Sequence, residues 1–235
     1  MFIISEISPQ FSGDLATAEQ MILQSKLGGA EAIKVQLYEP EQFNKPESHR
    51  MSFEELKHLQ QFAKHHGIDL FATPFAPKFL DWCVQLDMKY MKVAARMHVN
   101  FPELTRDIMS LKKPTFVSIP ADMAKEDQDK IEIVDHAMYL YCVVKYPTLV
   151  EEFEMPDFNN SRFHGISDHT LGNSAALFAS AHGAKYLEKH FTLRNSFQRT
   201  GEMAHLCSMT MEDLAMIKNT AMEFETLRRV TGMNG

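Results

Sequence analysis

The chain has 235 residues, 45% of them hydrophobic, and a formal net charge of −7. This length suits one large α/β domain or two small ones, and the negative charge argues against nucleic-acid or anionic-membrane partners. No apolar run approaches the ~20 residues of a membrane-spanning helix, and the start of the chain lacks a basic signal-peptide region, so we expect a cytoplasmic protein. Three separated cysteines, Cys83, Cys142 and Cys207, indicate reduced thiols in place of disulfides or a zinc motif.

Short apolar runs alternate with helical patterns along the whole chain. The predicted strands cover residues 2–7, 30–37, 68–72, 90–94, 115–119 and 137–144, with two more inside 163–191. The predicted helices cover residues 14–28, 52–67, 79–83, 101–111 and 211–227, with a short one inside 124–135 and one between the last two strands. The chain therefore repeats a strand-then-helix unit from its first residues to its last helix.

Eight such units in this length are the arithmetic of a (β/α)8 barrel, also called a TIM barrel. A doubly wound open sheet is the alternative architecture. It would normally have fewer strands and a glycine-rich phosphate loop after the first strand, and the sequence has no such loop. No linker or change of composition divides the chain. We therefore predict an α/β fold, a single TIM-barrel domain over residues 1–235.

The segment from Phe163 to Phe191 has the strongest chemical signal. Alternation along a strand places Ser167 and His169 on one face of its first strand, and Glu188 and His190 on one face of its second. The carboxyl ends of neighbouring parallel strands lie side by side, so two imidazoles can meet on one metal ion. A buried strand has no structural reason to end in Ser-x-His or Glu-x-His.

Other polar side chains also fall near predicted strand ends, where TIM barrels have their active sites. They are Glu6, Lys34, Gln36, Thr73, Lys92, Ser118 and Tyr146. Two lysines and several hydroxyl groups suit a phosphate or carboxylate, and two histidines with a carboxylate suit a divalent transition ion. This combination points to carbon–carbon or phosphoryl chemistry on a sugar phosphate or an enol phosphate.

Each of these positions alone also has an ordinary structural explanation. A lysine on a strand can reach solvent at the barrel rim, and a single histidine is more often a satisfied core residue than a ligand. The joint pattern favours a site, because burying several charges without a ligand is costly. Three other lysines, Lys89, Lys185 and Lys189, are expected to lie in solvent.

These residues resemble the sialic acid synthase family of barrel enzymes. The matching segments, in chain order, are Ile33–Gln36, Ala72–Phe75, Met91–Ala94, Tyr146–Thr148, Ile166–Gly172, Leu187–Leu193 and Cys207–Met209. The Ser-Asp-His-Thr-Leu-Gly and Glu-Lys-His-Phe-Thr-Leu segments are specific at this separation, whereas Thr-Pro-Phe alone is weak. The resemblance covers nearly the whole chain.

The family condenses phosphoenolpyruvate with an open-chain 2-acetamido sugar such as N-acetylmannosamine, and it releases phosphate and a nonulosonate, a sialic acid-like product. The resemblance implies a divalent metal bound by His169 and His190, with Mn²⁺ as the expected ion and Mg²⁺ or Co²⁺ as alternatives. The implied catalytic residues are Glu6, Lys34, Lys92, His169 and Glu188. The implied substrate-binding residues are Gln36, Thr73, Ser118, Tyr146 and Ser167, of which Gln36 and Tyr146 contact the sugar.

The sequence departs from the family pattern mainly on the sugar side. Gln10-Phe11-Ser12 replaces the family's Asn-His-Asn, Ala95 and Met97 replace a serine and a glutamate, and Val144 replaces an asparagine. For an aspartate that the family has before Cys207, the candidates are Glu202 and His205. The family's antifreeze-like C-terminal domain, which reaches a partner subunit's site with an arginine, has no counterpart before Gly235. The resemblance implies a homodimer, and the missing segment implies a separately encoded C-terminal domain as the alternative.

Three functions stay open on the sequence alone. The first, which we favour, is a synthase that condenses phosphoenolpyruvate with an altered sugar aldehyde. The second is a non-catalytic relative that binds a metal or an anionic sugar as a sensor or subunit. The third is a metal-dependent sugar isomerase or epimerase, which would leave the paired lysines Lys34 and Lys92 without a purpose.

Overall fold

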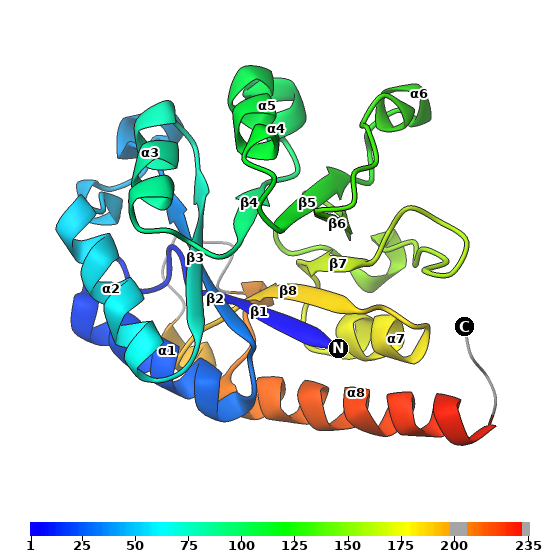
Figure 1. Cartoon of the computed structure of the whole chain (residues 1–235). Coiled ribbons are helices and arrows are strands. Elements are labelled where there is room, and N and C mark those ends of the chain that lie inside the picture. The colour runs from blue at the N-terminus through cyan, green and yellow to red at the C-terminus, as the bar shows by residue number, and fades with distance from the viewer. Residues whose placement is uncertain (198–205, 232–235) are drawn as a thin grey trace.

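Eight parallel strands form a closed barrel in the computed structural model, which describes residues 1–197 and 206–231 (Figure 1). The strands follow one another around the ring in chain order, and β8 pairs with β1 to close it. They are β1 (Phe2–Glu6), β2 (Ala32–Leu37), β3 (Asp69–Pro74), β4 (Met91–Val93), β5 (Thr115–Pro120), β6 (Ala137–Cys142), β7 (Gly165–Asp168) and β8 (Tyr186–His190). The predicted TIM barrel is confirmed.

Helices of very different lengths surround the barrel. They are α1 (Leu15–Gly28), α2 (Phe53–His65), α3 (Pro77–Gln85), α4 (Met97–Asn100), α5 (Pro102–Ser110), α6 (Lys125–Asp129), α7 (Ser174–Ala181) and α8 (Met211–Thr231). Short 3-10 helices are η1 (Pro40–Phe43), η2 (Glu47–His49), η3 (Val150–Glu152) and η4 (Asn195–Phe197). The charged segment after β5 forms only five helical residues, as predicted. None of the helices in the described ranges combines the length and apolarity needed to cross a membrane.

The helix starts follow from local capping. Asp14 accepts a hydrogen bond from the Ala16 N–H at the start of α1, and Ser52 and Glu55 form the predicted capping box of α2.

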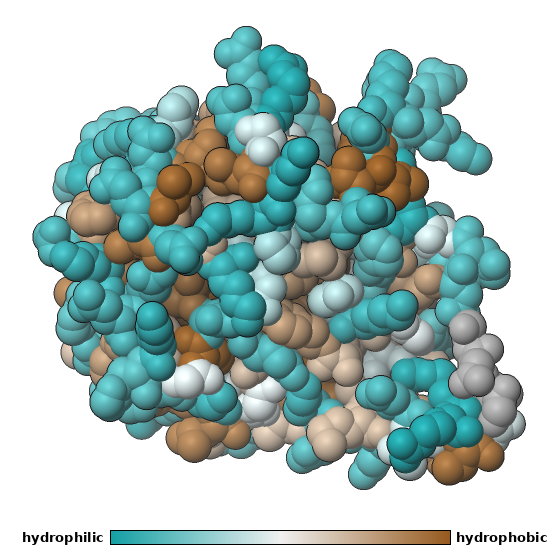
Figure 2. All heavy atoms as spheres, in the orientation of Figure 1, coloured by the Kyte–Doolittle hydropathy of each residue, from teal (hydrophilic) through white to brown (hydrophobic). Residues whose placement is uncertain are grey.

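The long α8 packs beside α1 and α7 at the edge of the barrel (Figure 1). On the face shown in Figure 2, hydrophilic residues cover most of the surface, and hydrophobic ones are confined to separate patches. The strand residues themselves are mostly buried.

Two predicted strands end two residues away from the expected position. β3 continues through Pro74, although the strand was expected to end at Ala72, before Thr73-Pro74. The N–H of Phe75 donates to the carbonyl oxygen of Leu37 in β2 at 2.9 Å, so the nitrogen of Pro74 faces the other neighbour, β4. β3 and β4 are paired only at Ala72 and Met91, so the missing N–H of the proline costs no ladder hydrogen bond. At β6, the strand ends at Cys142 and not at Val144.

Side chains that point into the barrel form two layers. The lower layer is aromatic and consists of Phe2, Phe71, Tyr90, Phe116 and Tyr186, whose neighbouring ring centroids lie 5.6–6.0 Å apart. Two positions after four of these rings, those of Phe71, Tyr90, Phe116 and Tyr186, the residues are polar and form the upper layer at the carboxyl ends. On β1 that position is the apolar Ile4, and Glu6 is the polar residue at the end of the strand. The aromatic layer closes the barrel from below and gives the polar layer a rigid, water-excluding floor.

Gly165 in β7 permits the close approach of β8. A Cβ atom at this position would lie 1.9 Å from the main-chain carbonyl oxygen of Tyr186, its register partner. We expect Gly165→Ala to lower the free energy of unfolding by at least about 3 kcal/mol, because the backbone can relieve this overlap only by opening the β7–β8 ladder. Urea unfolding monitored by circular dichroism would measure the loss.

The matched control is Gly67→Ala, at the turn that leads into β3. This residue has a φ of +68° with no atom within 4 Å of an added Cβ, so only the left-handed backbone conformation opposes alanine. The expected loss is about 1–2 kcal/mol. Equal losses in the two variants would contradict the role assigned to Gly165.

Candidate active site

The carboxyl ends of the strands open into a cavity of about 180 Å³. Its lining includes Glu6, Lys34, Gln36, Lys92, Ser118, Tyr146, Ser167, His169, Glu188 and His190. Ten side chains were implied as catalytic or substrate-binding, and His190 was implied as an additional metal ligand. Of these eleven, only Thr73 does not line the cavity. Thr73 is fully buried, and its hydroxyl accepts a hydrogen bond from Lys34 at 3.3 Å. The structure therefore brings all the predicted residues together, while their chemical roles stay predictions.

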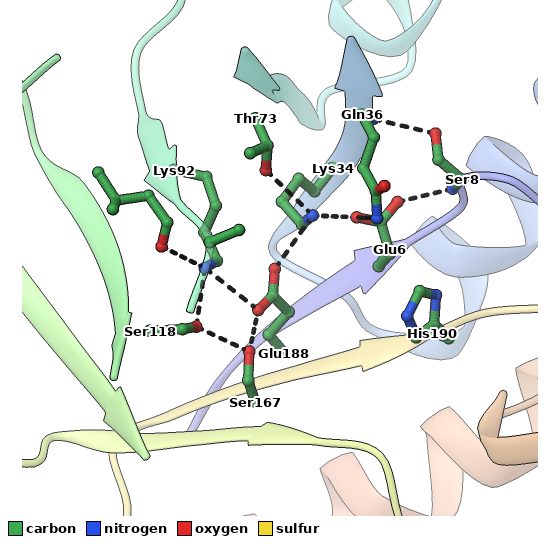
Figure 3. A network of polar contacts seen from close by, with 12 residues as sticks. Glu6, Ser8, Lys34, Gln36, Thr73, Lys92, Ser118, Ser167, Glu188 and His190 are labelled. Carbon is green, nitrogen blue, oxygen red and sulfur yellow. Dashed lines mark hydrogen bonds and ion pairs between the residues drawn. The ribbon is translucent and has the colours of Figure 1, made fainter. Parts of the chain in front are cut away.

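Lys34 from β2 links two buried carboxylates (Figure 3). Its ammonium group donates to Glu6 and lies 3.3 Å from Oε1 of Glu188. Burial alone would lower the pKa of Lys34, but the two carboxylates outweigh this effect and raise the pKa. The lysine is therefore charged at neutral pH.

Glu6 is fixed from a second side. The main-chain N–H of Ser8 donates to Oε1 of Glu6 at 2.6 Å, and the side-chain amide of Gln36 lies 3.4 Å from Oε2. Burial raises the pKa of the Glu6 carboxyl group, against the opposing effect of Lys34. Glu6 thus combines a fixed orientation with an increased tendency to accept a proton.

Lys92 from β4 is the second buried ammonium group, with only 2% of its surface exposed. It donates to Ser118 Oγ at 2.7 Å and to the carbonyl oxygen of Val93 at 2.8 Å, and it lies 3.7 Å from Oε2 of Glu188. Burial lowers the pKa of Lys92, because its one nearby carboxylate is more distant than those around Lys34.

Glu188 from β8 lies between the two lysines (Figure 3). The hydroxyl group of Ser167 donates to it, and the Ser167 and Ser118 hydroxyl oxygens are 3.0 Å apart. Burial opposes ionisation, but Lys92 and Lys34 together with the Ser167 hydrogen bond lower the pKa of Glu188 to about 2. Glu188 is therefore an anion at neutral pH, and it holds both ammonium groups in place.

His169 and His190 lie at the same rim, with their ring centroids 5.7 Å apart. Tyr146 packs against both rings, at centroid distances of 4.0 Å and 5.8 Å. Nδ1 of His169 lies 2.9 Å from the carbonyl oxygen of Val143, which can only accept, so Nδ1 carries the proton. Burial lowers the pKa of His169 to about 4, and it lowers the pKa of His190 well below its ordinary value. Both imidazoles are therefore neutral at pH 7.

These two rings have the chemistry of metal ligands. Within residues 1–197 and 206–231, their hydrogen bonds are made through Nδ1, which leaves each Nε2 available as a donor to a cation. The same part of the chain has no group of three or more His, Cys, Asp or Glu side chains that could hold an ion. The donor set fits a divalent transition ion with two protein ligands and with open positions for water or substrate oxygens.

Lys189 corrects one expectation. It was expected in solvent, but it is 1% exposed, and its ammonium group lies 2.8 Å from Oδ2 of the fully buried Asp168. The two residues are register partners on β8 and β7, and both leave the strands on the outer face, which helices cover. Lys89 and Lys185 are exposed, as expected.

Sequence reasoning missed one wall of the cavity. This wall consists of three aromatic rings, those of Phe43, Phe75 and Phe101. The ring centroid of Phe75 lies 5.1 Å from that of Phe43 and 6.0 Å from that of Phe101. Arg96 and Asn100 also line the cavity. All five lie beyond strand ends, from one residue to several residues away, so strand alternation could not place them, although the aromatic character of the loops was a visible signal.

Three departures from the family pattern lie at the cavity itself, whereas Gln10, Phe11 and Ser12 are not among its lining residues. Ala95, Met97 and Val144 all line it, whereas Glu202 and His205 lie outside the described residues. The cavity therefore has a charged side, formed by the lysines and carboxylates, and a side where polar family residues are replaced by apolar ones.

Comparison with known proteins gives a consistent set of relatives. A family model described as the NeuB family matches residues 42–230. The N,N'-diacetyllegionaminic acid synthase of Legionella pneumophila is 28% identical over 96% of this chain and 72% of its own length. The pseudaminic acid synthase of Campylobacter jejuni is 29% identical over 84% of this chain and 67% of its own length. The human N-acetylneuraminate-9-phosphate synthase is 27% identical over 87% of this chain and 66% of its own length.

A solved structure agrees with these relatives. The N-acetylneuraminic acid synthetase of Leptospira borgpetersenii matches with a TM-score of 0.86 and 25% identity, over 100% of this chain and 86% of that one. An uncharacterized protein of Methanocaldococcus jannaschii is 28% identical, and the match covers 64% of its length. The chain thus spans about two thirds of the length of the curated relatives it matches, from 64% to 72% in those named here.

Proposed function

Because the chain belongs to the NeuB family, the family of sialic acid synthases, we propose that it condenses phosphoenolpyruvate with an open-chain acetamido sugar such as N-acetylmannosamine or a related aldehyde. The C3 carbon of phosphoenolpyruvate attacks the aldehyde carbon and forms the new carbon–carbon bond. Water then adds to C2, and the C2–O bond to phosphate breaks. The products are a nonulosonate and inorganic phosphate, so one water is consumed for each phosphate released.

The pair of buried ammonium groups supports this proposal most strongly. Lys34 and Lys92 lie in one cavity, each next to a hydroxyl group that can donate a further hydrogen bond, Thr73 and Ser118 respectively. Phosphoenolpyruvate carries a phosphate and a carboxylate, and preorganised ammonium and hydroxyl groups stabilise both. Ser167 completes the donors on the Lys92 side. Glu188 pairs with both ammonium groups before substrate binds, and the phosphate and carboxylate oxygens of the substrate would then contact the same ammonium groups.

The remaining residues act on water and on the sugar. Glu6, with its raised pKa and fixed orientation, positions the attacking water and accepts its proton. Gln36 and Tyr146, which both line the cavity, would contact the sugar. A divalent metal held by His169 and His190, with Mn²⁺ as the expected ion and Mg²⁺ or Co²⁺ as alternatives, would polarise the aldehyde as a Lewis acid.

The apolar side of the cavity favours an altered acceptor. Ala95, Met97 and Val144 lie with the phenylalanine wall around the same space. Arg96 and Asn100 also line this space, but the apolar side chains at the three replaced positions offer no hydrogen bond to a sugar hydroxyl there and favour a deoxygenated carbon or an additional acetamido methyl group. An acceptor less hydroxylated than N-acetylmannosamine therefore fits this chain better.

Phosphate release from phosphoenolpyruvate tests the proposal. The protein would be assayed with a panel of acetamido and diacetamido aldoses, with Mn²⁺, Mg²⁺ or Co²⁺, and with no aldose as the control. We expect release that requires an aldose and stops when a chelator is added. If no aldose supports turnover and calorimetry detects no phosphoenolpyruvate binding, the result contradicts the proposal and favours the alternative of a non-catalytic relative that binds a metal or an anionic sugar.

A further inference from the structure

Gln10 is a buried side chain that none of the roles above uses. It follows β1, is 4% exposed, and its main-chain N–H donates to the carbonyl oxygen of Ile7 at 3.1 Å. Its carboxamide group reaches four polar partners. They are the carbonyl oxygens of Ile7 at 3.0 Å and Ser8 at 2.8 Å, and Ser208 Oγ and His190 Nδ1, each at 3.2 Å.

The chemistry of these partners decides which way the amide points. Two main-chain carbonyl oxygens can only accept hydrogen bonds, so they require the amide nitrogen on their side. The opposite orientation would turn the amide oxygen toward both carbonyl oxygens and leave it repelled. Oε1 of Gln10 therefore faces Ser208 and His190, and Nδ1–H of His190 donates to it.

This hydrogen bond determines the state of the His190 ring. A proton held on Nδ1 leaves Nε2 with its lone pair, and the bond also fixes the ring plane. His169 is in the same state, because Val143 offers a main-chain carbonyl oxygen to its Nδ1 at 2.9 Å. The tautomer of His169 is thus fixed by a main-chain acceptor, and the tautomer of His190 by the side chain of Gln10.

We propose that Gln10 is a positioning residue, which selects the Nδ1–H tautomer of His190 so that both histidines present Nε2 to one divalent ion. This inference rests on the metal site of the proposed function. An amide suits the position because it donates backward to two carbonyl oxygens and accepts forward from the imidazole. A carboxylate would be repelled by the carbonyl oxygens of Ile7 and Ser8, and an apolar side chain would offer no acceptor.

The test compares the wild type with Gln10→Met, which keeps the length of the side chain and removes the acceptor. Nitrogen-15 NMR of labelled histidine side chains in the metal-free protein reports which ring nitrogen carries the proton. We expect the Nδ1–H form for His190 in the wild type and a shift toward Nε2–H in Gln10→Met, with the His169 signals unchanged. Calorimetric titration with Mn²⁺ should show affinity about 10–100-fold weaker in the variant.

Ser208→Ala is the matched control. It removes another hydrogen bond to the same amide oxygen but leaves the acceptor for His190, so tautomer and Mn²⁺ affinity should stay as in the wild type. A wild-type spectrum with the proton on Nε2 of His190 would overturn the inference without any variant. An unchanged tautomer in folded Gln10→Met would also overturn it. If the wild type does not bind Mn²⁺, the metal site of the proposed function fails, and the NMR result still decides the role of Gln10.

Discussion

Glu188→Gln should lower the free energy of unfolding by about 3–5 kcal/mol, because it leaves a buried ammonium group without its charge partner. Lys34 keeps Glu6, but the nearest carboxylate to Lys92 is Glu188, at 3.7 Å. Burial already lowers the pKa of Lys92, and without Glu188 the lysine would lose its proton more readily. The variant should therefore also bind phosphoenolpyruvate much more weakly. Urea unfolding and calorimetry at pH 7 measure the two effects.

A double-variant cycle separates charge pairing from general disruption. Lys92→Met combined with Glu188→Gln removes both partners, so the double variant should be more stable than Glu188→Gln alone by at least about 1 kcal/mol. The exposed pair of Lys89 and Asp69, whose charged groups are 2.8 Å apart, is the control, with an expected loss below about 1 kcal/mol in Lys89→Met. Wild-type stability and phosphoenolpyruvate affinity in Glu188→Gln would show that this carboxylate does not organise the lysines.

The barrel and the charged half of the site were predictable for one physical reason. Side chains alternate along a strand, and a closed parallel barrel directs one set of them inward and brings all carboxyl ends to one rim. Lys34, Lys92 and Glu188 follow from this rule alone. Their positions depend on strand identity and register, which apolar runs in the sequence indicate well.

Where the prediction failed, the missing information was three-dimensional. Alternation places Lys189 on the outer face of β8, and an outer face suggests solvent, but helices cover that face in a TIM barrel. Its partner Asp168 on β7 was the available signal, because a buried lysine needs a nearby carboxylate. The phenylalanine wall depends on how the loops after β2, β3 and β4 fold, and loops have no periodicity from which to predict it.

His169→Ala should abolish activity while the barrel stays folded. In the proposed metal site, loss of one of the two imidazole donors would remove the Lewis acid, whose contribution of several kcal/mol to the transition state corresponds to a rate loss of at least about 10³-fold. Stability should fall by only about 1–2 kcal/mol, because among the described residues the ring bonds only through Nδ1, to the Val143 carbonyl oxygen at 2.9 Å and to Cys142 Sγ at 3.8 Å, and packs on Tyr146. Phosphate release, Mn²⁺ titration and a thermal melt measure the three properties.

The control is His182→Ala, at an exposed position where α7 ends, remote from the cavity lining. It removes an imidazole of the same size and should leave activity and Mn²⁺ affinity as in the wild type.

The pKa of His169 is lowered to about 4, so protons should compete with the metal at this ligand only near pH 4. The Mn²⁺ affinity of the wild-type protein should therefore not depend on His169 protonation between pH 6 and 8. Full activity in His169→Ala would mean that the reaction proceeds without this ligand, and the metal assignment would then be wrong.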